Sequence, residues 1–83
     1  RDDLWKAAAA KGNPDSYFTI SNIFFRGEYV AQDIPLAIEG YKFAASHPCT
    51  TQRMAMEQLV KAYQMIGNEK EADEWKAKLN EIE

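Results

Sequence analysis

The residues with the most obvious chemistry are His47 and Cys49, which flank Pro48 in the stretch SHPCT. The chain has one histidine and one cysteine. Zinc takes four protein ligands in structural sites, or three and a water in catalytic sites, and no further cluster of ligands accompanies this pair. A Cys–His nucleophile needs an oriented pair and an oxyanion hole, whereas a proline between the two residues indicates a turn. We therefore interpret both as turn and packing residues, and we expect no enzymatic activity, no metal and no other cofactor.

The charged residues do not form a pattern for nucleic acid or phosphate. The formal net charge is -3, and the lysines and arginines are scattered rather than gathered in a basic stripe, which argues against nucleic-acid binding. The sequence has no Gly-rich phosphate loop and no Ser-His-Asp set. In the segment 69–78, acidic residues interleave with lysines. This pattern is typical of a solvated helix face with ion pairs of ~0.3–0.5 kcal/mol each, and it also suits an acidic docking face.

Helical periodicity runs along the whole chain, and strand alternation is nearly absent. Asn13, Asp33 and Asn68 are predicted helix caps, and Gly27 and Gly67 are predicted to end helices. Together these signals predict five helices: over 2–11, from the cap at residue 13 to 26, from the cap at residue 33 to the break at 46–50, over 51–66, and over 69–82. Such short connections place neighbouring helices antiparallel.

Four of the predicted helices carry an apolar stripe at spacings of three and four residues, which we expect to face the core. The expected inward residues are Tyr17, Ile20, Ile23 and Phe24; Ala37, Tyr41, Ala44 and Ala45; Ala55, Leu59, Ala62, Tyr63 and Ile66; and Ala72, Trp75, Leu79 and Ile82.

The chain also repeats part of its own pattern. An aromatic residue followed by two adjacent alanines occurs first as Trp5, Ala8 and Ala9, and again as Tyr41, Ala44 and Ala45. Small side chains at equivalent places let two helices approach closely, while the aromatics fill the space beside them. A single helix pair cannot bury both of its faces, so this recurrence predicts that helix pairs stack in tandem.

The stretch GNPDSYFTISNIFFRGEYVAQDIPLAIEGYKFAA resembles a Sel-one-like repeat, a relative of the tetratricopeptide repeat. The matching positions are Gly12, Asn13, Phe24, Gly27, Val30, Asp33, Ala37, Tyr41, Ala44 and Ala45. The chain departs from the family pattern at Ile20-Ser21, which replaces Leu-Gly, at Tyr29, which replaces a loop glycine, and at Gly40, which replaces a tryptophan. The later unit is closer to an ordinary tetratricopeptide repeat, through Ala55, Leu59, Tyr63, Gly67, Ala72 and Trp75.

The resemblance implies an all-α fold, an antiparallel helix-pair α-solenoid of about five helices, in a single repeat domain over residues 1–83. Residues 1–12 are then the second helix of a preceding repeat, 13–47 the Sel-one-like repeat, and 48–83 a tetratricopeptide-like C-terminal capping repeat with a charged outer face. Because the chain opens directly as a helix and lacks an initiator methionine, we expect further repeats or domains upstream.

A second stripe on the helix at 14–26 is the candidate binding surface. Phe18, Asn22, Phe25 and Arg26 lie on a face offset from the inward stripe. In the family, the first helix of each pair lines a concave peptide-binding surface, which implies that these residues join Glu57, Lys61 and Gln64 of the helix at 51–66. Aromatics supply buried area, and Arg and Asn supply directional hydrogen bonds. The alternative is that both phenylalanines pack against a neighbouring helix.

We expect a non-catalytic protein–protein interaction module, a scaffold or adaptor, that binds a protein or peptide segment on the concave helix face. Two alternatives stay open: an inhibitor or immunity-type protein that blocks a partner enzyme, and a structural spacer within a larger chain. No apolar run approaches the ~20 residues of a membrane span, so we expect a soluble protein without membrane insertion. The compartment stays open, with a bacterial cytoplasm or periplasm favoured.

Overall fold

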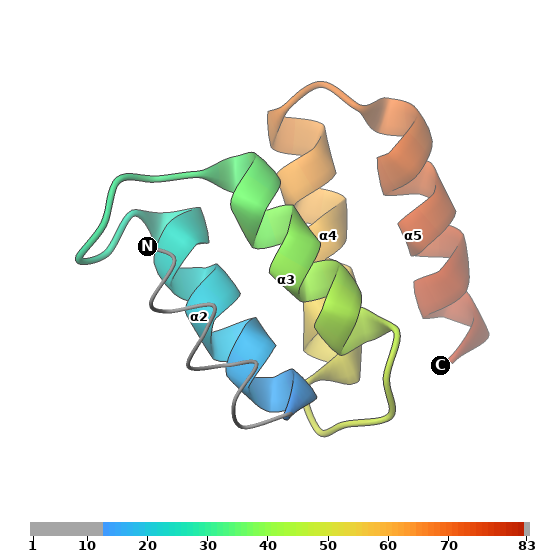
Figure 1. Ribbon diagram of the computed structural model, residues 1–83. Coiled ribbons are helices and arrows are strands. Elements are labelled where there is room, and N and C mark those ends of the chain that lie inside the picture. The colour runs from blue at the N-terminus through green and yellow to red at the C-terminus, as the bar shows by residue number, and fades with distance from the viewer. Residues whose placement is uncertain (1–12, 83) are drawn as a thin grey trace.

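The computed structural model describes residues 13–82, and within this range the protein is helical with no strand. Its helices are α2 (Pro14–Arg26), α3 (Ile34–Ala45), α4 (Gln52–Met65) and α5 (Glu69–Glu81). They lie side by side, and each runs opposite to the one before it (Figure 1). The helix predicted over 2–11, with Trp5, Ala8 and Ala9, lies outside the described residues.

Local capping explains where three of these helices begin. Asn13, Asp33 and Asn68 each accept a hydrogen bond from a backbone N–H of the first turn, at 2.9, 3.0 and 3.2 Å. Such side chains satisfy N–H groups that have no partner within the helix. Gly27 ends α2 in the left-handed region, with φ 74°, and its N–H donates to the Ile23 carbonyl at 2.9 Å. The predicted caps are therefore confirmed.

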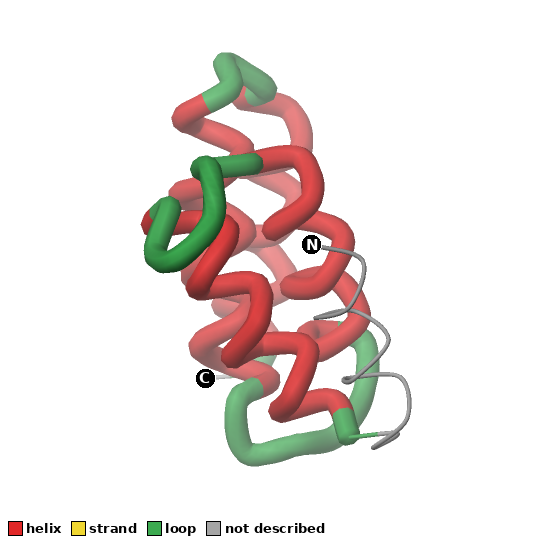
Figure 2. The backbone as a smooth tube through the Cα atoms, turned by 60° about the vertical axis from the view of Figure 1, so that its left-hand side comes forward, coloured by secondary structure: helices red, strands yellow, loops and turns green. Residues whose placement is uncertain are grey.

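The helices pack in chain order. α3 lies between α2 and α4, α5 packs on α4, and α2 and α4 touch each other over only a short stretch. The α2–α3 and α4–α5 connections lie at one end of the helices and the α3–α4 connection lies at the other (Figure 2). The resulting body measures 33 × 27 × 14 Å, so it is thin in one direction.

Alanines dominate the contacts between these helices. Five of them are fully buried, namely Ala37, Ala44, Ala55, Ala62 and Ala72. Their small side chains allow close approach of the helix axes, and large buried side chains, Phe24, Tyr41 and Leu59, fill the space beside them. The prediction that alanines face the core is confirmed for the described helices.

The inward stripes were predicted too long at two helix ends. Ile66 and Ile82 are 47% and 49% exposed, and both follow the last helical residue. Beyond the final turn, no helix among residues 13–82 covers the side chain, although the apolar spacing continues in the sequence. Tyr17, Ile23 and Leu79 are half-buried rather than fully enclosed.

One carboxylate ties α2 to the start of α4. Asp15 accepts hydrogen bonds from the Thr51 hydroxyl at 2.5 Å, the Thr51 backbone N–H at 3.1 Å and the Thr50 hydroxyl at 3.0 Å. The hydrogen bond from the Thr51 hydroxyl is the main reason that the pKa of Asp15 lies below its ordinary value. Thr51, at the start of α4, makes no side-chain cap hydrogen bond, and these bonds to Asp15 hold the start of the helix instead.

No helix within residues 13–82 combines the length and the apolar character that crossing a bilayer requires.

Candidate functional site

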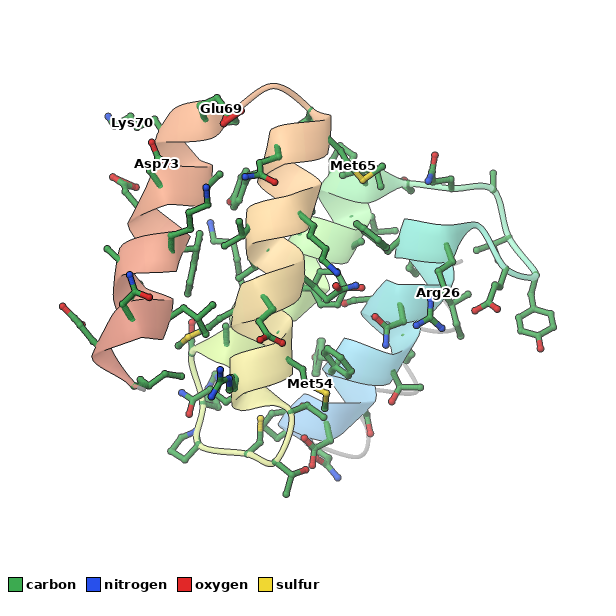
Figure 3. The ribbon with its side chains drawn as sticks, turned by 180° about the vertical axis from the view of Figure 1, so that it is seen from behind. Arg26, Met54, Met65, Glu69, Lys70 and Asp73 are labelled. Carbon is green, nitrogen blue, oxygen red and sulfur yellow. The ribbon has the colours of Figure 1, made fainter. Side chains whose placement is uncertain are left out.

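A hollow of about 270 Å³ lies between α2 and α4. Helical geometry explains which residues reach it, because side chains three or four positions apart share a face. α2 contributes Phe18, Asn22 and Arg26, each four residues after the last. α4 contributes Met54, Glu57 and Gln58. The two helices form the two walls of the hollow, and Figure 3 labels Arg26 on the α2 wall and Met54 on the α4 wall.

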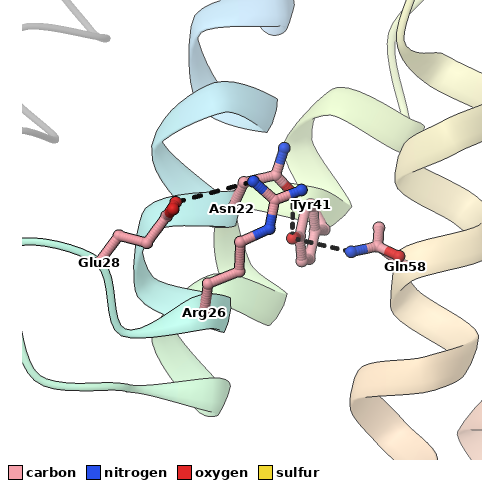
Figure 4. A network of polar contacts seen from close by, with 5 residues as sticks. All are labelled: Asn22, Arg26, Glu28, Tyr41 and Gln58. Carbon is pink, nitrogen blue, oxygen red and sulfur yellow. Dashed lines mark hydrogen bonds and ion pairs between the residues drawn. The ribbon is translucent and has the colours of Figure 1, made fainter.

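Tyr41 of α3 joins the two walls through its hydroxyl group. The hydroxyl donates to Asn22 Oδ1 at 2.5 Å and accepts from Gln58 Nε2 at 3.4 Å. Figure 4 shows Asn22 and Gln58 on either side of this hydroxyl. The Tyr41 side chain is fully buried, and burial raises the pKa of Tyr41 above the ordinary value of a tyrosine, although the Gln58 hydrogen bond and the charge of Arg26 act the other way.

Charged groups of opposite sign stand on the two walls. Arg26 lies 3.7 Å from Glu28, and Glu57 lies 3.7 Å from Arg53 (Figure 4 shows the first pair). The side chains of Arg26 and Glu57 are 58% and 45% exposed. Ion pairs this exposed are worth little, so both charges can still interact with a bound partner.

The structure brings together four of the seven residues predicted for the binding surface. Phe18, Asn22 and Arg26 line the hollow from α2, and Glu57 lines it from α4. Phe18 also packs on the core, with its ring centre 5.7 Å from that of Tyr41. The Phe18 side chain therefore both lines the hollow and packs against the core, so it could serve recognition and packing together.

The other three predicted residues do not line this hollow. Phe25 is half-buried against the core, and its ring meets Tyr41 edge-on at 6.0 Å. Lys61 and Gln64 are exposed further along α4. The family resemblance implies a surface that continues along α4 past Glu57, whereas the hollow is lined from α4 by Met54, Glu57 and Gln58.

Sequence reasoning missed three members of the site: Met54, Gln58 and Tyr41. Met54 and Gln58 are four residues apart on α4, so the spacing rule that selected α2 residues could have found them. Tyr41 was correctly predicted as core, but no local signal indicates that its hydroxyl meets Asn22 and Gln58.

His47 and Cys49 both contact the end of α3. His47 Nδ1 lies 2.7 Å from the Phe43 carbonyl oxygen, and Cys49 Sγ donates to the Ala44 carbonyl at 3.4 Å. Because a carbonyl only accepts, Nδ1 carries the proton. The His47 ring also stacks on Phe43, with centres 4.2 Å apart. The Phe43 carbonyl also accepts from the Ser46 backbone N–H at 3.2 Å, so these contacts add to the hydrogen bonding at the end of α3.

A second hollow and the acidic side chains are the other places where chemistry could occur. The second hollow, of about 200 Å³, lies between α2 and α3 and is lined by Tyr17, Glu39, Gly40 and Phe43. Glu39 is the one charged residue in this lining. Over residues 13–82, no three His, Cys, Asp or Glu side chains gather closely enough to hold a metal ion.

Compared with protein-family models, with curated proteins and with solved structures, the chain has no significant match in any of the three.

Proposed function

We propose that this chain is a non-catalytic protein–protein interaction module, and that a segment of a partner protein lies in the hollow between α2 and α4. The observation that carries the proposal is the lining of that hollow. Apolar side chains, Phe18 and Met54, stand beside two amides and two opposite charges. Binding sites for proteins typically combine an aromatic contact with surrounding polar groups.

The size of the hollow favours part of a polypeptide over a small molecule. Small-molecule sites usually enclose about 300–1,000 Å³ and bury most of the ligand, whereas this hollow is smaller, about 270 Å³, and partly open to solvent. An extended segment could place one apolar side chain against Phe18 and Met54. Neighbouring acidic and basic side chains of the segment would then meet Arg26 and Glu57, which stand on opposite walls.

We also propose that the helices form two stacked pairs of an α-solenoid resembling Sel-one-like and tetratricopeptide repeats, with α2 and α3 as one pair and α4 and α5 as the next. Packing in chain order and the buried alanines support this arrangement. In such a stack, α2 and α4 are the first helices of their pairs and share one surface. Further repeats upstream of the chain belong to the same proposal.

The test uses a displayed library of random peptides selected on the intact chain. Met54 and Met65 lie on the same helix and are 46% and 56% exposed, but only Met54 lines the hollow. Replacing either by lysine puts the same charge on α4 at little cost to folding, since exposed substitutions usually stay within about 0.5 kcal/mol. We expect M54K to weaken binding of the selected peptides at least about tenfold, and M65K to leave it unchanged.

Other outcomes of this selection contradict the proposal in distinguishable ways. If no peptide is sensitive to M54K, the hollow is not a peptide site, and a spacer role is favoured. If a folded enzyme is inhibited through this surface while peptides are not bound, the chain is an inhibitor or immunity-type protein instead.

A further inference from the structure

We propose that the hollow recognises the main chain of the bound segment through one oriented donor and one oriented acceptor, Asn22 Nδ2 and Gln58 Oε1. This inference rests on the proposed function, and it states which chemical group of the partner the site would bind. It predicts recognition that tolerates many partner sequences, because every residue of a peptide presents the same N–H and C=O groups.

The argument begins with the polarity of the hydrogen bonds at Tyr41. A tyrosine hydroxyl has one hydrogen to donate, and Tyr41 donates it to Asn22 Oδ1. The oxygen of the Tyr41 hydroxyl also accepts a hydrogen bond from Gln58 Nε2. These two bonds fix the orientation of each side-chain amide: Asn22 turns its oxygen toward the hydroxyl, and Gln58 turns its nitrogen toward it. Asn22 is left with its NH₂ group to offer, and Gln58 is left with its carbonyl oxygen and the second hydrogen of Nε2.

None of these remaining groups is satisfied within the described part of the chain. Among residues 13–82, the side chains of Asn22 and Gln58 hydrogen-bond only to Tyr41. Both side chains are half-buried and line the hollow. A segment that fills the hollow displaces water from them, and a polar group that loses water without gaining a partner costs about 1–3 kcal/mol. A suitable occupant must therefore supply an acceptor for Asn22 and a donor for Gln58.

A peptide main chain in extended form supplies both groups. Its N–H and C=O groups have no internal partners and are used in the same way when a peptide is added to the edge of a sheet. A carboxylate would suit Asn22 but would face the Gln58 oxygen without a hydrogen to give it. A phosphate has the same defect, and the net charge of -3 further disfavours it. The pair therefore favours the main chain of a polypeptide over an isolated carboxylate or phosphate group.

Tyr41 is suited to hold this arrangement over a wide range of pH. Its ring is fully buried between the helices, with Phe18 and Phe25 against it. A hydroxyl that stays protonated continues to donate to Asn22, and burial raises the pKa of Tyr41. The two amides consequently keep their orientation without a bound partner, which reduces the entropy lost on binding.

The first experiment changes the partner rather than the protein. Peptides obtained from the library selection are resynthesised with single amide bonds replaced by esters, which removes one N–H at a time. We expect an ester at one position to weaken binding about tenfold and esters elsewhere to have little effect. In the Gln58→Met variant, which lacks the acceptor, the penalty of that same ester should disappear. Because the ester series needs no protein variant, it stays informative even if a variant folds poorly.

The second experiment changes the donor. Asn22→Asp keeps an oxygen for the Tyr41 hydroxyl but replaces the outward NH₂ group by a second acceptor. Asn80→Asp, at an exposed position of α5, makes the same change of charge far from the hollow. We expect N22D to weaken peptide binding about tenfold or more and N80D to leave it unchanged, with both variants folded by circular dichroism.

The outcomes separate this inference from the proposed function. If peptides lose binding to M54K, while esters bind as well as amides and N22D behaves as N80D, the hollow binds peptides and the main-chain inference is wrong. If no selected peptide responds to M54K, both fail together.

Discussion

The Tyr41 hydroxyl donates a hydrogen bond at 2.5 Å to Asn22 Oδ1, so a fully buried residue of α3 fixes a side chain of α2 that lines the hollow. The same hydroxyl accepts from Gln58 of α4. One buried group therefore connects three consecutive helices, and it belongs both to the core and to the candidate site.

Removing this hydroxyl should destabilise the fold by a small amount. Tyr41→Phe keeps the ring and deletes the hydrogen bonds of the hydroxyl to Asn22 and Gln58, which should lower the free energy of unfolding by about 1 kcal/mol. Tyr63 is the matched control, since it is 6% exposed and its hydroxyl has no hydrogen-bond partner within residues 13–82. Urea unfolding of Y41F and Y63F measures the difference, and equal losses in the two variants would show that the two hydrogen bonds of the Tyr41 hydroxyl contribute nothing to stability.

Asp15 should make stability depend on pH in the acid range. Hydrogen bonds from Thr51 and Thr50 lower its pKa in the folded state. The folded protein therefore holds the charged form more strongly than the unfolded chain, so the contribution is complete above the ordinary aspartate pKa. It is lost as the pH falls through that value and toward the folded-state pKa.

Asp15→Asn tests this dependence directly. We expect a lower free energy of unfolding than wild type at neutral pH, and a difference that shrinks as the solution is acidified. Asp73→Asn on the exposed face of α5 removes the same charge without this set of bonds. A difference between D15N and wild type that stays constant with pH would contradict the assignment.

Ala44 marks a place where helices approach too closely for a larger side chain. It is fully buried on α3, so Ala44→Leu should cost about 1–3 kcal/mol through overpacking. Ala77 is exposed on α5, and Ala77→Leu should change stability by no more than about 0.5 kcal/mol. Thermal and urea unfolding of both variants provide the comparison, and a tolerated A44L would mean that the interface has spare room.

Tyr29 occupies a backbone conformation that favours glycine. Its φ is 65° and its side chain is 94% exposed, so the ring contributes little packing to offset the strain of about 1–3 kcal/mol. Tyr29→Gly relieves the strain but gives the unfolded chain more freedom. We expect a net gain of up to about 1 kcal/mol, whereas Tyr29→Ala keeps the conformation and should stay near wild type. If Y29G unfolds more readily than Y29A, the relief of backbone strain does not outweigh the added freedom of the unfolded chain, and a Y29A variant less stable than wild type would show that the ring has a structural role in the loop.

The candidate site could be predicted from the sequence only in part. Spacing along α2 identified Phe18, Asn22 and Arg26, because a single helix places every fourth residue on one face. On α4, the family resemblance implied a surface that includes Lys61 and Gln64, which the hollow does not include. Where two helices approach each other depends on their packing, and that information is absent from the spacing within one helix.

The sequence by itself determined the helices and their buried alanines. Caps such as Asn13, Asp33 and Asn68 act on backbone groups two or three residues away, so short-range patterns are sufficient to place them. Only the tertiary structure decided that Asp15 binds Thr51 and that Tyr41 orients Asn22 and Gln58. Those contacts join residues far apart in the chain, and their geometry exists only after the helices have packed against one another.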